Sequence, residues 1–441
     1  MSFLVKDTVK KTNTVDASQK FHLYMPSGII NELSGICRHN EKTHIYCICS
    51  PQTGVEEKSI CGHFTTENFI KYTKEPPIIL PDSVFDQSGV SAGSAISQKD
   101  GITLFYTGLV KKTEPSEESS DEKNIVKVFS QDGFSAGKKN AVLEKGEVQK
   151  SGCTDLSHPK VWHTEEGFFM MLGGSFEEKG CAAIFFSHDL EKWHFYRRIT
   201  STENMGHAWQ YPDAFVIDGA AVLNVSVDSA VKDKKLTSGF CALTENEACG
   251  FHTLDFGHNF HAPQSFTDEK GRRIMLAVIS SLYQKETKAF ACLTIPRSIT
   301  RRKGRLYQEP LEELSFLRES RRVVSLQRGE RCDTFNGAVF EAILRFSSKA
   351  YTVFFRDNIL LQCENNTVTI AKTSMYGRES SSFSADDITT VRVFSDVYTI
   401  EIFVDGKSFT SYVEDSQKGG IYIAEGSCRG EIYQLLTCER S

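Results

Sequence analysis

Short apolar runs separated by turns constrain this chain more than any other feature of its sequence. Runs of five or six residues rich in aromatic and β-branched side chains recur, and glycine or polar turn residues bound each of them; they include 102–107, 168–172, 182–186 and 274–279. Long segments with an apolar residue every 3.6 positions are absent, and one short amphipathic helix is predicted over 311–318. The sequence therefore predicts an all-β protein.

The length and the texture of the C-terminal third indicate two domains. The chain has 441 residues, and a single hydrophobic core rarely grows beyond about 250–300 residues. Residues 338–346, 391–394 and 398–404 alternate, at least in part, between apolar and polar side chains. The last run meets Asp405-Gly406, a strong hairpin signal because both turn positions favour positive φ. A β-sandwich whose strands each have one solvated face is expected there.

A weak internal repeat appears in the first 300 residues. The stretch 186–193 resembles 64–72, because each pairs a strand with a polar turn and a closing aromatic residue. Such units suit the blades of a propeller, in which each sheet is one repeat. The acidic stretch 114–122 is interpreted as a solvated loop.

Composition excludes several classes of protein. The formal charge is −6, charged residues are 24% and aromatic residues 11%, which argues against disorder and against a nucleic-acid partner. No run approaches the ~18 apolar residues of a membrane span, and residues 1–6 lack the apolar region of a signal peptide. A cytoplasmic protein with no membrane partner is therefore expected.

The cysteines and histidines show no metal-binding pattern. Thirteen cysteines contain no Cys-x-x-Cys spacing and the twelve histidines are scattered. Buried reduced thiols, no metal and no cofactor are expected.

Several segments resemble the motifs of one enzyme family, in the same order. Residues 21–35 (FHLYMPSGIINELSG) resemble the opening H-x-x-P-x-x-G-W-x-N-D-P-N-G, and Gly62-His63 with Tyr72 resembles W-G-H-A-x-S-x-D-L-x-x-W. The later matches are 258–266, 271–274, 293–297, 304–310 and 398–404. In this order and spacing the chain resembles glycoside hydrolase family 32, the β-fructosidases that include invertase and sucrose-6-phosphate hydrolase. The resemblance implies a five-bladed β-propeller (1–310), a linker (311–325) and a C-terminal β-sandwich (326–441).

The resemblance also implies where the catalytic groups would lie. Retaining glycosidases need two carboxylates about 5–5.5 Å apart, a nucleophile and an acid/base. The matching positions here are Glu32 for the nucleophile, Gln210 for the acid/base and His158 for the transition-state-stabilising Asp. None carries the residue of the family. Glu32 keeps a carboxylate but adds a methylene, and misplacement by ~1 Å can cost ~100-fold in rate.

Gln210 is the most damaging of the three substitutions. An amide cannot protonate a leaving oxygen near neutral pH, and losing general acid catalysis typically costs ~10²–10⁴ in rate. His158 has Ser157 beside it where the family has Arg. Candidate substrate-binding residues are Asn31, Ser94 and Ser157, together with the candidate compensating carboxylates Asp155 and Asp213.

Three functional hypotheses follow. The leading one is a β-fructosidase-family protein that binds a fructoside or another sugar, or supports an active partner, with hydrolysis impaired or lost. A rival is a working glycoside hydrolase or fructosyltransferase in which Glu32 is the nucleophile and His158 or Asp155 supplies the proton. The third is a non-catalytic interaction protein. A small carbohydrate is the expected ligand, and assembly as a homo-oligomer or with an active homologue stays open.

Overall fold

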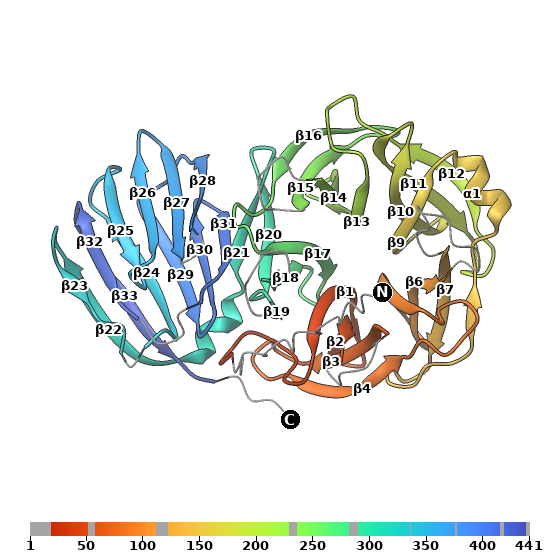
Figure 1. Cartoon of the computed structure of the whole chain (residues 1–441), viewed down its shortest axis with the longest axis horizontal. Helices are drawn as coiled ribbons and strands as arrows, with labels where there is room; N and C mark the ends of the chain where they lie inside the picture. Colours follow the sequence, from red (N-terminus) through yellow and green to blue (C-terminus); the bar gives the residue numbers. More distant parts are fainter. Residues whose placement is uncertain are drawn as a thin grey trace, which may run out of the picture.

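Two bodies of β-sheet lie side by side in the computed structural model (Figure 1). The structure describes residues 19–51, 58–111, 122–228, 236–281, 290–335, 337–374, 377–414 and 419–437. Within these residues, five sheets surround a common centre and two six-stranded sheets form a separate sandwich. The predicted all-β fold, a five-bladed β-propeller followed by a β-sandwich, is confirmed.

The five propeller blades follow one another along the chain, and neighbouring strands within each are antiparallel. Blade 1 contains β1 (Ile29–His39), β2 (Lys42–Ser50), β3 (Ile60–Thr66) and β4 (Thr73–Ile79); blade 2 contains β5 (Gly89–Gln98), β6 (Gly101–Val110), β7 (Glu122–Ser130) and β8 (Lys139–Ala141). Blade 3 contains β9 (Thr154–Thr164), β10 (Gly167–Phe176), β11 (Lys179–Ser187) and β12 (His194–Ile199); blade 4 contains β13 (Trp209–Ile217), β14 (Ala220–Asp228), β15 (Leu236–Leu243) and β16 (Ala248–Thr253). Blade 5 contains β17 (Phe260–Thr267), β18 (Arg273–Ser280), β19 (Ala291–Leu293), β20 (Arg297–Arg302) and β21 (Arg305–Pro310).

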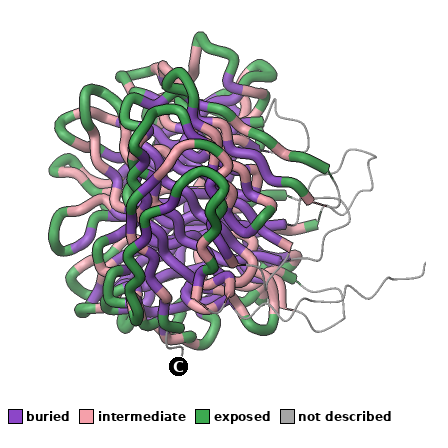
Figure 2. Tube along the Cα trace, turned by 90° about the vertical axis from the view of Figure 1, so that its left-hand side faces the viewer, coloured by how far each residue is buried: buried purple, intermediate pink, exposed green. Residues whose placement is uncertain are grey.

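The sandwich packs two sheets face to face. One sheet has the order β22 (Arg318–Leu326), β33 (Cys428–Leu435), β24 (Phe340–Phe346), β29 (Thr390–Asp396), β30 (Thr399–Val404), β31 (Lys407–Tyr412). The other has the order β23 (Arg331–Cys332), β32 (Ile421–Glu425), β25 (Tyr351–Phe355), β26 (Ile359–Glu364), β27 (Thr367–Ser374), β28 (Gly377–Ser384). Alternate residues such as Val353 and Phe355 are fully buried between the sheets. Buried residues fill the interior, and exposed ones collect at the turns (Figure 2).

The sequence patterns located most of the strands. The apolar runs at 102–107, 168–172, 182–186 and 274–279 lie within β6, β10, β11 and β18. Asp405 and Gly406 form a two-residue turn between β30 and β31, with φ of 51° and 69°, and Val404 pairs with Lys407 across it. Of the predicted acidic loop 114–122, all but Glu122, the first residue of β7, lies outside the described residues.

The helix prediction needs correction in two respects. Residues 311–318 contain a 3₁₀-helix, η1 (Glu312–Leu317), in which Leu314 and Leu317 are buried, as is its N-cap Leu311. A spacing of three matches the 3₁₀ period of three residues per turn, which explains why this apolar pattern does not form an α-helix. The sequence also missed α1 (Lys145–Ser151), whose seven residues are too few for a periodic pattern; it ends at Gly152 with φ 67°.

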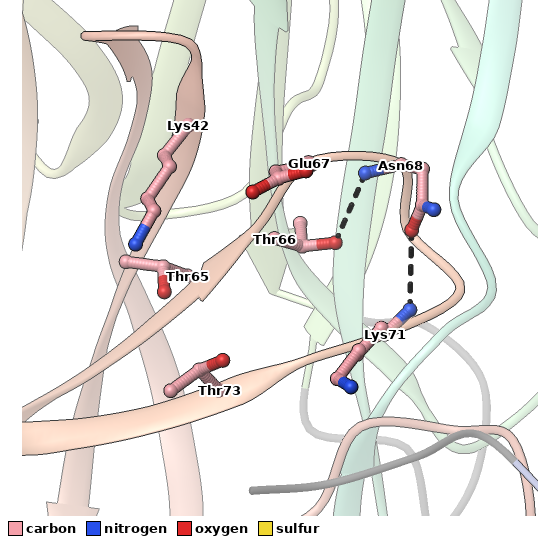
Figure 3. Close-up of a pocket in the computed structure, with 7 residues that line it drawn as sticks. All are labelled: Lys42, Thr65, Thr66, Glu67, Asn68, Lys71 and Thr73. Atoms are coloured by element: carbon pink, nitrogen blue, oxygen red, sulfur yellow. Dashed lines mark hydrogen bonds between the residues drawn. The ribbon is translucent and has the colours of Figure 1, made fainter.

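The internal repeat corresponds to the turn between the third and fourth strands of a blade. In blade 1 the Thr66 hydroxyl accepts hydrogen bonds from the backbone N–H groups of Asn68 and Phe69, and the Asn68 side chain accepts from those of Ile70 and Lys71. Figure 3 shows the bonds from Asn68 to Thr66 and from Lys71 to Asn68. These side chains build the turn, which borders a hollow of about 290 Å³.

Blade 3 has the same pattern of hydrogen bonds in its outer turn. The Ser187 hydroxyl accepts from the N–H groups of residues 189 and 190, and Asp189 accepts from those of 191 and 192. Blade 2 has the same turn with Ser130 and Asp132. In blades 1 to 3, a Ser or Thr followed two residues later by Asn or Asp therefore marks the outer turn, because both side chains replace missing backbone partners.

A buried cluster of charges joins the propeller to the sandwich. Arg297 of β20 donates to Asp255 at 2.9 Å and to Glu401 of β30. His22, in the segment before β1, contacts Asp396 through Nδ1 and Glu401 through Nε2, each at 2.9 Å. All five side chains are fully buried. Buried charges are tolerated only when they are paired and hydrogen-bonded. Removing any one of these five side chains would therefore deprive another buried charge of a partner and destabilise the fold.

The cysteines match the sequence-based expectation of reduced, buried thiols. Among the twelve cysteines that the structure describes, ten are buried and none is in a disulfide. In the described part of the chain, no helix combines the length and the apolar character needed to cross a membrane.

The charge cluster predicts a pH dependence of stability. Burial alone would lower the pKa of His22, but hydrogen bonds and charges from Asp396 and Glu401 outweigh burial and raise that pKa above its ordinary 6.5. The stabilisation from protonated His22 is therefore fully present below pH 6.5 and is lost as the pH rises through the raised pKa. We expect the thermal midpoint of the wild-type protein to fall more steeply above pH 6.5 than that of His22→Asn. Equal slopes in differential scanning fluorimetry would contradict this assignment.

Candidate active site

The first strand of each blade lies on the inside of the ring. β1, β5, β9, β13 and β17 contact one another in succession and close the circle from β17 back to β1. Four side chains from four of these strands contact one another there: Glu32, Ser91, His158 and Tyr211. The propeller thus brings together residues 179 positions apart in the chain.

Three hydrogen bonds orient the Glu32 carboxylate. One oxygen accepts from the Ser91 hydroxyl at 2.9 Å and from the Ala92 backbone N–H at 2.8 Å. The other oxygen accepts from the Tyr211 hydroxyl at 2.6 Å. Glu32 is half-buried, so one carboxylate is held in a fixed position within reach of a ligand.

His158 packs beside this carboxylate. Its ring stacks on Tyr211 with 4.3 Å between ring centres, and its Nε2 lies 3.4 Å from the Ser91 hydroxyl. Its Nδ1 lies 3.2 Å from the hydroxyl of Ser157. Burial lowers the pKa of His158 to about 4, although the Glu32 charge opposes this shift. The imidazole is therefore neutral near pH 7 and has no acidic proton to donate as a general acid at that pH.

Gln210 precedes Tyr211 on β13. Its side chain is half-buried, and among the described residues its carboxamide has no hydrogen-bond partner. The amide is therefore free to donate to and accept from a ligand, but it has no ionisable proton.

Irregular backbone near the site aims these side chains. The pairing register of each innermost strand shifts beside the site residues, between Ile30 and Glu32 in β1, for example, and between Gln210 and Asp213 in β13. Tyr211 and His158 have φ of 52° and 57°, a conformation that non-glycine residues rarely adopt. Such bulges recur next to binding sites because they re-aim a side chain out of the regular alternation.

The two candidate compensating carboxylates lie in other surroundings. Asp213 is fully buried, and one of its oxygens accepts from the N–H and the hydroxyl of Ser265 at 2.7 and 2.6 Å. Its other oxygen lies 2.7 Å from the Lys160 ammonium. The Asp155 side chain is 62% exposed, lies 3.7 Å from Lys123 and lines a cavity of about 400 Å³ beside α1.

The remaining predicted binding residues occupy varied positions. Ser94 is buried, and its hydroxyl accepts from the N–H of Val161 in blade 3. Asn31 donates to Ser50 at 2.7 Å, and Ser157 contacts His158.

Sequence reasoning missed Ser91, Ala92 and Tyr211, which hold Glu32. Only the position of Tyr211 directly after Gln210 could have drawn attention to it. The contacts themselves span 59 to 179 residues and leave no local pattern.

No group of three or more His, Cys, Asp or Glu side chains suited to a metal ion occurs in the described ranges.

The sequence matches the family model described as the glycosyl hydrolases family 32 N-terminal domain over residues 22–310. The chain belongs to glycoside hydrolase family 32. It is similar to a sucrose-6-phosphate hydrolase from Bacillus subtilis, with 28% identity over 425 residues that cover 88% of this chain and 86% of the relative.

Solved structures of family 32 proteins share the fold. The sucrose-6-phosphate hydrolase of Lactobacillus gasseri superposes with a TM-score of 0.85 at 18% identity, covering 97% of this chain and 95% of that one. A variant of the Bombyx mori family 32 β-fructofuranosidase in complex with sucrose superposes with a TM-score of 0.83 at 19% identity, covering 97% and 96% of the two chains. At sequence identities of 18% and 19%, this structural similarity shows a shared fold and nothing more.

Proposed function

We propose that this family 32 protein binds a β-fructoside or a related sugar at the centre of the propeller and hydrolyses it slowly or not at all. Glu32 takes the nucleophile position, His158 the position of the transition-state-stabilising residue and Gln210 the acid/base position. The relatives named sucrose-6-phosphate hydrolase and β-fructofuranosidase support a sucrose-like ligand.

The observation that carries the proposal is the absence of an acid among the candidate residues around Glu32. Gln210 is an amide, and His158, with a pKa of about 4, is neutral near pH 7. Asp213 is committed to Ser265 and Lys160, while Asp155 is largely exposed beside Lys123. Without a general acid, cleavage of the glycosidic bond loses ~10²–10⁴ in rate.

The same residues support binding. The free carboxamide of Gln210 and the oriented oxygens of Glu32 offer both donors and acceptors for sugar hydroxyls. Charge-assisted hydrogen bonds to a carboxylate are stronger than those between neutral groups.

The direct test combines calorimetry with an activity assay. We expect sucrose or sucrose 6-phosphate to bind to the purified protein, with turnover at least about 10²-fold below the ~10 s⁻¹ of a typical enzyme. Turnover of sucrose, sucrose 6-phosphate or inulin at ordinary enzymatic rates would sink the proposal.

Glu32→Ala tests the location of the site. Removing a charged partner of buried hydrogen bonds typically costs about 1.5–3 kcal/mol, so the affinity for sucrose 6-phosphate is expected to fall by about 10- to 100-fold in calorimetric titration. Glu309→Ala, on the outer strand β21, is the matched control and should bind like the wild type. Equal affinities of the two variants would place the sugar elsewhere.

An active hydrolase or fructosyltransferase with altered chemistry is the second candidate. The three hydrogen bonds that fix Glu32 favour it, because a nucleophile must be oriented. This alternative requires that Glu32→Gln abolish turnover of some fructoside.

A further inference from the structure

Blade 3 carries a second cavity at the opposite end of its strands from the central site. It has a volume of about 500 Å³ and is lined by Trp162, Thr164, Glu165, Glu166, Phe169, Ile184, Tyr196 and Arg197. Thr164 lies six positions after His158 along β9, which corresponds to about 20 Å of extended strand. The cavity is therefore separate from the propeller centre, and its volume lies within the usual range of ligand pockets.

Three aromatic rings, those of Trp162, Phe169 and Tyr196, line this cavity. Trp162 stacks on Phe169, with ring centres 5.7 Å apart and planes 18° apart. Tyr196 meets Phe169 edge-on at 5.4 Å and remains 52% exposed. Apolar surface that stays exposed beside a cavity in a folded protein often marks a binding site.

Polar groups surround the rings. Glu165 and Glu166 are exposed at the turn between β9 and β10. The Arg197 guanidinium lies over the Tyr196 ring at 5.4 Å, and its Nε is buried with no hydrogen-bond partner among the described residues. The guanidinium of Arg197 and the carboxylates of Glu165 and Glu166 give the site both hydrogen-bond donors and acceptors.

Charge and shape restrict the ligand. One guanidinium against two carboxylates gives the rim a net charge of −1, which disfavours an anionic ligand such as a sugar phosphate. A neutral saccharide suits the arrangement, because its apolar C–H face packs on aromatic rings while its hydroxyls both donate and accept. We propose that this cavity on blade 3 is a second, non-catalytic binding site for a neutral saccharide.

The tryptophans provide a built-in probe. The chain has three, and Trp193 and Trp209 are buried whereas Trp162 is partly exposed in the cavity. We expect sucrose or 1-kestose to protect tryptophan emission from acrylamide quenching in the wild-type protein, and sucrose 6-phosphate to protect less. Trp162→Phe should abolish this protection. Tyr196→Ala should weaken the apparent affinity by about two- to tenfold.

Two further variants separate this site from the central one. Glu32→Ala should keep the sugar-dependent protection, and Tyr422→Ala, which removes an exposed tyrosine of the sandwich, should behave as the wild type. Protection that persists in Trp162→Phe, or that disappears in Glu32→Ala, would assign the signal to the centre and overturn the proposal. Absence of protection by both neutral sugars in the wild type would overturn it as well.

Discussion

Replacing Gln210 with glutamate is expected to raise the rate of sucrose hydrolysis by about 10²- to 10⁴-fold over the wild-type protein. The substitution adds an ionisable proton at a half-buried side chain that has no partner among the described residues. In the acid/base position proposed above for residue 210, this carboxyl would share the site with Glu32, which raises the pKa of one of the two and suits it to act as an acid. Release of reducing sugar measures the change.

Two controls make this result specific. Gln210→Asn keeps an amide and should leave the rate unchanged, as should Gln362→Glu on β26 of the sandwich. If Gln210→Glu hydrolyses sucrose no faster than these controls, then Gln210 does not occupy the acid position, and the proposed cause of the slow chemistry is wrong.

Replacing Arg297 with methionine is expected to destabilise the protein by about 3–5 kcal/mol. Methionine has a similar length but no charge, and it would leave the carboxylates of Asp255 and Glu401 buried without their shared cation. Burial works against the ionisation of both carboxyls, and the Arg297 charge keeps their pKa values below the usual range. The denaturant midpoint of the variant in urea measures the loss.

Arg302→Met on the same strand is the matched control. Arg302 lies 3.2 Å from Glu309, and both side chains are more than half exposed. An exposed ion pair is worth about 0–1 kcal/mol, so this variant should unfold close to the wild-type midpoint. Similar midpoints for both arginine variants would show that the buried cluster contributes no more than a surface pair.

Local signals in the sequence predicted the fold well. The Asp405-Gly406 turn was recognisable because its positive φ values restrict which residues fit. The outer blade turn was visible as a faint repeat, since each copy needs a hydroxyl and a carboxylate or amide two residues apart. By contrast, α1 escaped detection because its seven residues make two turns, and its stability comes from packing rather than from an apolar period.

The candidate site was less accessible to sequence reasoning. Motif positions such as Glu32 and Gln210 can be recognised in a single sequence. The residues that contact them in the folded protein cannot be. Asp213 illustrates this, because the sequence made it a candidate compensating carboxylate. In the structure its oxygens are engaged by Ser265, 52 residues away, and by Lys160. The Tyr211 hydroxyl likewise reaches Glu32 from a β-bulge, in which Tyr211 has a positive φ. No residue type in this stretch of the sequence predicts that bulge.

The contacts of His22 bear on how the protein is made. His22 is synthesised well before its partners, because Asp396 and Glu401 follow it by 374 and 379 residues. At about 5–20 residues per second, roughly 20 to 75 seconds of synthesis separate them. The propeller segments therefore emerge well before the carboxylates that bind His22. Until the sandwich is complete the propeller lacks these contacts, and we expect the nascent chain to be most open to misassembly during that interval.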